Sequence, residues 1–101
     1  MSITVETNGT VANIVLSGEI DYSTQEEFKS ANEQVLSTDN ITEICVNFED
    51  ATFLDSSGFR ALLVLNKEAD SSGKSLILLN INAHLRETFE IGGFDKVFRF
   101  E

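Results

Sequence analysis

The chain has 101 residues, of which seven are Lys or Arg and 17 are Asp or Glu, so its formal net charge is −10. This length predicts a single domain over residues 1–101 and excludes multidomain enzyme architectures. Such an acidic chain repels phosphate backbones and anionic lipid surfaces, so we expect neither nucleic acid nor a membrane as its partner. A content of 42% hydrophobic residues is typical of a folded globular protein rather than of an acidic disordered tail.

The cysteine content and the first residues indicate a cytoplasmic protein. Cys45 is the one cysteine and cannot form an internal disulfide. The segment Met1–Glu6 has neither the basic region nor the apolar region of a signal peptide. The longest aliphatic run, Ala61–Leu65, is far shorter than the ~20 residues that cross a bilayer. We therefore expect no transmembrane helix, and we interpret Cys45 as a small buried hydrophobe rather than a reactive thiol.

The chain begins with the pattern of a β-hairpin. Ile3 and Val5 alternate with polar residues, and a second strand is predicted over Val11–Leu16. Asn8 and Gly9 lie between these strands and tolerate the positive φ angles of a type I′ turn. The sequence therefore predicts an antiparallel hairpin.

Helical and strand periods alternate through the rest of the chain. The expected elements are a helix over about Thr24–Leu36, a strand over Ile41–Phe48, a helix over about Ser57–Ala69, a strand over Leu76–Leu79, a short helix between Asn82 and Gly92, and a strand over Val97–Phe100. A capping box is predicted in Ser23–Glu26, and a connector over Glu49–Leu54. Alternation of this kind implies right-handed crossovers. The predicted class is α/β, in the order β-β-α-β-α-β-α-β, with a mainly parallel sheet and an antiparallel first strand.

Few residues of the chain suit catalysis. His84 is the only histidine, its helical neighbours offer no nucleophile, and neither a G-x-S-x-G elbow nor a glycine-rich phosphate loop is present. Asp21, Asp50 and Asp55 could hold a hard cation, but loop aspartates more often cap helices or form turns. We expect no enzyme activity, no cofactor and no metal site. A small serine hydrolase is the least favoured alternative, because no activating base accompanies the serines.

The segment from Asp55 to Arg60 joins a predicted strand to a predicted helix. Asp55 or Ser56 can act as the N-cap, since short polar side chains accept hydrogen bonds from the free amides of a first helical turn. Such a cap is common chemistry and does not by itself indicate a function.

The predicted helix after this cap has two unlike faces. At ~100° per residue, one apolar face is formed by Ala61, Leu62, Leu65 and Ala69. The opposite face is formed by Ser56, Phe59, Arg60, Leu63 and Lys67. An outward apolar patch rimmed by charge is typical of an interaction site. The alternative is a helix that is buried on two sides.

Phosphorylation of Ser56 would place about −1.5 to −2 charges in the middle of that patch. Asp21 and Asp55 would repel the new charge, and desolvating it against Phe59 and Leu63 would be unfavourable. Modification of Ser56 would therefore switch off the binding of a partner that meets the bare hydroxyl.

Two spaced motifs resemble a known family. Gly18–Asp21 after the second predicted strand, Phe53–Gly58 after the third, and the ending Gly93–Phe100 closely resemble the bacterial anti-sigma factor antagonists of the STAS domain family. The order of predicted elements agrees with that family over nearly the whole chain. The resemblance implies a STAS-like fold.

The resemblance also implies a mechanism. Ser56 corresponds to the phosphate acceptor of a serine kinase that is itself an anti-sigma factor, and the unphosphorylated form binds this kinase and releases a sigma factor. A metal-dependent serine phosphatase restores the unmodified form. Asp21 corresponds to the family's loop aspartate beside the acceptor. The expected partner-binding residues are Asp21, Tyr22, Ser23, Asp55, Ser57, Gly58, Phe59, Arg60, Leu63 and Lys67.

The chain departs from the family at two places. Phe59 and Arg60 stand where many relatives have leucine and glycine, so the resemblance does not fix the choice of partner or the details of docking. The sequence ends at Glu101, without the further helix that many members append, so part of one sheet face or edge could stay open to a homodimer or another subunit. The alternative function is that of a STAS-type accessory subunit, which makes a constitutive contact in a transport ATPase or a sensory assembly.

Overall fold

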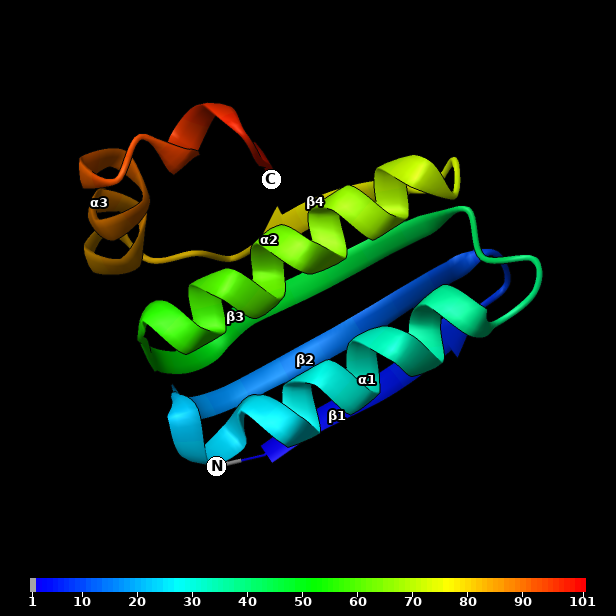
Figure 1. Cartoon of the computed structure of the whole chain (residues 1–101), viewed down its shortest axis with the longest axis horizontal. Coiled ribbons are helices and arrows are strands. Elements are labelled where there is room, and N and C mark those ends of the chain that lie inside the picture. Colours follow the sequence, from blue (N-terminus) through cyan, green and yellow to red (C-terminus); the bar gives the residue numbers. More distant parts are fainter. Residues whose placement is uncertain (1) are drawn as a thin grey trace.

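Five strands form one sheet, as a computed structural model that describes residues 2–101 shows (Figure 1). The strands are β1 (Ser2–Asn8), β2 (Val11–Ile20), β3 (Glu43–Leu54), β4 (Ser75–Leu79) and β5 (Arg99–Phe100). Their order in the sheet is β1-β2-β3-β4-β5, with β1 antiparallel to β2 and every other pair parallel. The helices are α1 (Gln25–Ser37), α2 (Ser56–Ser71) and α3 (Ala83–Ile91), with the 3-10 turns η1 (Tyr22–Thr24) and η2 (Phe94–Lys96). The predicted α/β fold is confirmed.

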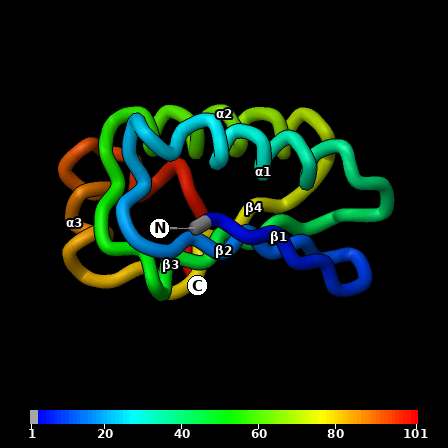
Figure 2. The backbone as a smooth tube through the Cα atoms, turned by 90° about the horizontal axis from the view of Figure 1, so that it is seen from below, coloured from blue at the N-terminus to red at the C-terminus, as the bar shows by residue number. Residues whose placement is uncertain are grey.

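The main core lies between the sheet and the helices α1 and α2, which lie side by side on one face (Figure 2). Ala12, Ile14 and Leu16 of β2 are fully buried and alternate with half-exposed residues, because successive strand side chains point to opposite faces. The helices bury one stripe each, formed by Phe28, Ala31 and Val35 of α1 and by Leu62, Leu65 and Ala69 of α2. Full burial of one large aliphatic side chain contributes roughly 1.5–3 kcal/mol, so these two helices hold much of the fold together.

Cys45 faces away from this core, as predicted. It pairs in register with Ile77 of β4, and both side chains are buried outside the main hydrophobic cluster. Burial, together with the neighbouring carboxylate of Glu43, raises the pKa of the Cys45 thiol to about 11. The thiol is therefore protonated at neutral pH, which confirms its interpretation as a small buried hydrophobe.

The hairpin turn differs from the prediction. Asn8 pairs with Val11, so the loop consists of Gly9 and Thr10. Among these residues only Gly9 has a positive φ, of 64°. A positive φ at the first loop position alone is the pattern of a type II′ turn rather than of the predicted type I′ turn.

The predicted connector over Glu49–Leu54 is wrong, because these residues continue β3. The pairing of β2 with β3 shifts twice, and each shift inserts one extra residue into β3. The buried residues in this part are Phe48, Ala51 and Leu54, at a spacing of three instead of two. Bulges thus removed the alternation that identifies a strand in sequence.

The C-terminal part was predicted more closely. The Asn82 side chain accepts a hydrogen bond of 2.8 Å from the amide of Leu85 and caps α3, which ends at Gly92. The last strand is shorter than predicted and begins at Arg99, because Val97 and Phe98 form a turn and a bend after η2.

Candidate functional site

Two aspartates follow directly on the carboxyl ends of neighbouring parallel strands. Ile20 and Leu54 are paired at the ends of β2 and β3, and Asp21 and Asp55 come next in the chain. The amide of Asp55 donates a hydrogen bond of 3.1 Å to the carbonyl of Ile20, which ties the two ends together. Figure 1 shows these ends on the side of the sheet where α1 and α2 begin.

Asp55 caps α2. One oxygen, Oδ1, accepts hydrogen bonds from the amides of Ser57 and Gly58 at 2.9 and 3.0 Å and from the Ser57 hydroxyl at 2.6 Å. The other oxygen, Oδ2, accepts a hydrogen bond of 3.1 Å from the amide of Tyr22. The Ser57 hydroxyl and these amides lower the pKa of Asp55 despite its partial burial, so the carboxylate is charged at neutral pH.

Asp21 caps η1 in a similar way. Its Oδ1 accepts hydrogen bonds from the amide and the hydroxyl of Ser23 at 3.0 and 2.6 Å. The amide of Asp21 donates to the hydroxyl of Thr24 at 2.9 Å, which completes a capping box. The box therefore lies two residues earlier than the predicted Ser23–Glu26, because the chain forms a 3-10 turn before α1.

The same local sequence, Asp-x-Ser, thus occurs at both strand ends. Its middle residue is Tyr22 in the first copy and Ser56 in the second, and both are exposed, Tyr22 to 74%. The hydroxyl of Ser56 forms no hydrogen bond with the residues that the structure describes, whereas the Ser57 hydroxyl is bonded to Asp55. Of the two adjacent serines, Ser56 presents the uncommitted hydroxyl.

A small hollow of about 220 Å³ lies beside this hydroxyl. Its lining consists of Tyr22, Gln25, Ser56, Ser57 and Arg60. The structure thus brings together most of the residues that the sequence predicted as a site: Asp21, Tyr22, Ser23, Asp55, Ser56, Ser57 and Arg60.

The predicted outward patch of Phe59 and Leu63 is wrong. Both side chains are partly buried and pack against the core. The ring of Phe59 lies 4.7 Å from that of Phe89 and 5.6 Å from that of Phe94, measured between centroids. Residues of α3 and η2 thus cover Phe59, so the alternative of burial on a second side holds for the apolar residues of this face, whereas Ser56, Arg60 and Lys67 stay exposed.

The remaining predicted residues have other positions. Gly58 is buried, and a Cβ atom there would clash with the Leu54 side chain and lie 3.1 Å from the carbonyl oxygen of Ile20. Lys67 is exposed farther along α2 and lines neither of the hollows described in this section.

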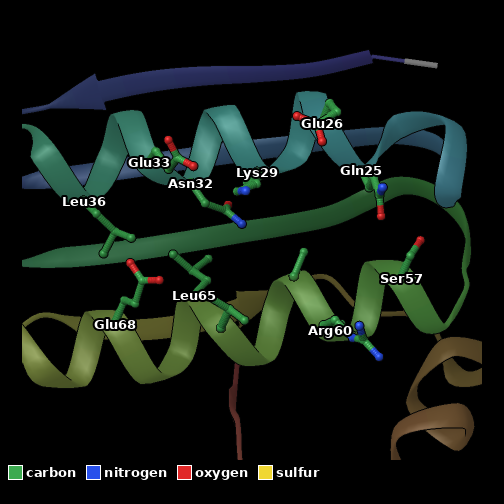
Figure 3. Close-up of a pocket in the computed structure, with 12 residues that line it drawn as sticks. Gln25, Glu26, Lys29, Asn32, Glu33, Leu36, Ser57, Arg60, Leu65 and Glu68 are labelled. Atoms are coloured by element: carbon green, nitrogen blue, oxygen red, sulfur yellow. The ribbon is translucent and has the colours of Figure 1, made fainter.

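A second hollow, of about 290 Å³, lies between α1 and α2 and was not predicted (Figure 3). Its apolar lining comes from Leu36, Ala61, Val64 and Leu65. Val64 is 49% exposed, one of the more exposed large apolar side chains. The one sequence signal for this hollow is the spacing of Ala61 and Val64, which lie at the edge of the predicted core stripe. These two residues line a hollow only because α1 packs beside α2.

Other chemistry is sparse in the part of the chain that the structure covers. No group of three or more His, Cys, Asp or Glu side chains within residues 2–101 is arranged to hold a metal ion. His84 is exposed on the first turn of α3. None of the described helices is long and apolar enough to span a bilayer.

Comparison with known proteins identifies similar chains. The STAS domain profile matches residues 2–101. A STAS-domain containing protein of Pseudomonas aeruginosa (strain UCBPP-PA14) is 29% identical over 92 residues, which cover 91% of this chain and 89% of that protein. The anti-sigma F factor antagonist of Lysinibacillus sphaericus is 30% identical over 80 residues, which cover 79% of this chain and 68% of that protein.

Solved structures agree with this similarity. The anti-sigma factor antagonist SpoIIAA in its unphosphorylated form has a TM-score of 0.78 at 26% identity, over 99% of this chain and 87% of that chain. SpoIIAA of Bacillus in the phosphorylated form has a TM-score of 0.77 at 26% identity, over 99% and 91% of the two chains.

Proposed function

The chain belongs to the STAS domain family, and on that premise we propose that it is an anti-sigma factor antagonist whose binding is switched off by phosphorylation of Ser56. The unmodified form binds an anti-sigma factor with serine kinase activity in the cytoplasm and so releases a sigma factor. A metal-dependent serine phosphatase reverses the modification. The similarity to the anti-sigma F factor antagonist of Lysinibacillus sphaericus and to the anti-sigma factor antagonist SpoIIAA supports the general role.

One observation carries the choice of Ser56. It is exposed at the start of α2 with its hydroxyl unbonded to the described residues, while the hydroxyl of its neighbour Ser57 is bonded to Asp55 at 2.6 Å. A kinase can therefore reach Ser56 without breaking the cap. SpoIIAA, a structural relative, has been solved in a phosphorylated form, which supports a modification of this kind.

The modification itself needs a nucleoside triphosphate that the partner kinase supplies. The Ser56 oxygen forms a bond to the γ-phosphorus, the bond to the departing diphosphate breaks, and the hydroxyl proton leaves to a base of the kinase. In the phosphatase a water oxygen forms a bond to phosphorus, the bond between phosphorus and the Ser56 oxygen breaks, inorganic phosphate leaves, and the serine oxygen takes up a proton. The chain itself acts as substrate and switch, without a catalytic group of its own.

The phosphate adds about −1.5 to −2 charges to a surface that already carries Asp55 and Asp21. The phosphate and these two carboxylates repel each other, and a partner that covered the phosphate would have to remove its water. The docking surface that we propose consists of Asp21, Tyr22, Ser23, Asp55, Ser56, Ser57 and Arg60. Phe59 and Leu63 are left out because their partly buried side chains pack against the core.

Capture of partners from the native cell tests the proposal. Wild-type protein and Ser56→Ala should retain the same protein kinase, identified by mass spectrometry, whereas Ser56→Asp should lose it at least tenfold. Ser30→Asp, on an exposed position of α1, adds the same charge elsewhere and serves as the control. Equal retention by Ser56→Ala and Ser56→Asp would contradict the switch and favour an accessory subunit with a constitutive contact.

A further inference from the structure

Arg60 lies one helical turn after Ser56 on the same face of α2. The two residues are in an i, i+4 relation, which places their Cβ atoms about 5–6 Å apart. Both side chains line the 220 Å³ hollow at the start of the helix. Long side chains in helices point back toward the N-terminus, and Figure 3 shows Arg60 extending toward the end of α2 that carries Ser57.

Arg60 has no carboxylate partner among residues 2–101. The ion pairs in that range join Arg86 to Glu90 and Arg99 to Glu101. In a chain with 17 acidic and seven basic residues, an arginine beside an exposed serine and outside any ion pair has its full hydrogen-bonding capacity available.

Other groups near Ser56 are poorly suited to hold a phosphate. The amides of Ser57 and Gly58, which would otherwise bind an anion at a helix start, already donate to Asp55. The carboxylate of Asp55 is charged and repels a second anion. Arg60 is the cation that lines the hollow, and its planar fork can donate two parallel hydrogen bonds to phosphate oxygens.

We propose that Arg60 holds the phosphate of modified Ser56 within the same helix turn. This inference rests on the proposed phosphorylation of Ser56 and adds its local consequence. The modification then changes the docking surface twice, because it adds a dianion and also withdraws the Arg60 guanidinium from a partner. Because of Arg60, the docking surfaces of the unmodified and the phosphorylated protein would differ in the available guanidinium as well as in the charge of the phosphate.

The test introduces phosphoserine at position 56 during synthesis, so that no kinase is needed. The second ionisation of this phosphate, with an ordinary pKa of about 6, is followed by phosphorus NMR in the wild-type background and in Arg60→Gln, Arg60→Lys and Lys67→Gln. The charged or titratable groups at this strand end are Asp21, Tyr22, Asp55 and Arg60, and Glu26, Lys29, Glu33 and Glu68 line the adjoining hollow with Arg60. Of these groups only Arg60 is altered. Lys67→Gln removes the same charge about two turns farther along α2 than Arg60.

We expect the phosphate pKa to rise by roughly half a unit in Arg60→Gln, as for loss of an exposed ion pair. Arg60→Lys should raise it by less, and Lys67→Gln should leave it unchanged. Equal values in wild type and Arg60→Gln, or an equal rise in Lys67→Gln, would overturn the inference. Either result would leave Ser56 as the proposed phosphate acceptor. In contrast, a kinase that modifies another residue would overturn the proposed function but not the contact between Arg60 and a phosphate on Ser56.

Discussion

The two Asp-x-Ser caps at the ends of β2 and β3 use the same chemistry and differ in what surrounds them. Asp21 caps a turn of three residues, and the third residue after it is Thr24, whose buried hydroxyl closes the capping box. Asp55 caps a helix of sixteen residues, and the third residue after it is Gly58, which has no side chain because Leu54 and Ile20 fill that space. The difference shows that the second cap packs closely against the ends of β2 and β3, and this close packing fixes the position of Ser56.

The largest effect should come from filling that space. In a helix, alanine is normally favoured over glycine by about 1 kcal/mol. We expect Gly58→Ala to destabilise the protein by about 1–3 kcal/mol instead, because its Cβ would crowd Leu54 and the Ile20 carbonyl. Urea unfolding measures the change in free energy, and a gain in stability would show that the second cap is as loosely packed as an ordinary helix start.

The next largest effect should be a difference in stability between variants that lack one or the other cap carboxylate. Asp55→Ala removes the acceptor of two α2 amides, of the Tyr22 amide and of the Ser57 hydroxyl, and should cost about 1–2 kcal/mol. Asp21→Ala, the matched variant of the other cap, removes the acceptor of one backbone amide and one hydroxyl and should cost about half as much. Equal losses in urea unfolding would contradict the view that Asp55 joins the two strand ends.

The smallest effect concerns pH. The pKa of Asp55 is lowered in the folded chain, so the unfolded state binds more protons in acid and stability falls as pH falls. The stabilisation by Asp55 should be complete above its unfolded pKa of about 4 and should be lost as pH drops through the lower folded value. The stability difference between wild type and Asp55→Asn, measured by urea unfolding at several pH values, should therefore shrink in acid. A difference that stays constant down to pH values of about 2 would argue against a charge effect.

Local rules predicted much of the candidate site. The cap of α2 at Asp55 was predicted from the short polar residues after the third strand, whereas the first capping box was predicted at Ser23–Glu26 and lies at Asp21–Thr24. Asn82 and Gly92 marked the ends of α3 for the same reason. These caps depend on residues within one helical turn of each other, so the local sequence is sufficient to predict them.

Contacts between distant segments could not be read in this way. A helical wheel placed Phe59 outside because it contains no information on Phe89 and Phe94, which lie about thirty residues later and cover that ring. The extension of β3 was missed because its two bulges depend on pairing with β2. The hollow beside Val64 likewise exists only because α1 packs next to α2.

Phosphate mapping tests the central role of Ser56 most directly. The kinase fraction captured from the native cell is incubated with ATP and the purified protein, and the modified residue is located by tandem mass spectrometry. We predict a single phosphoryl group on Ser56 and none on Ser57 or Ser23. A phosphate on either of these neighbours, or none on a chain that the kinase binds, would contradict the account.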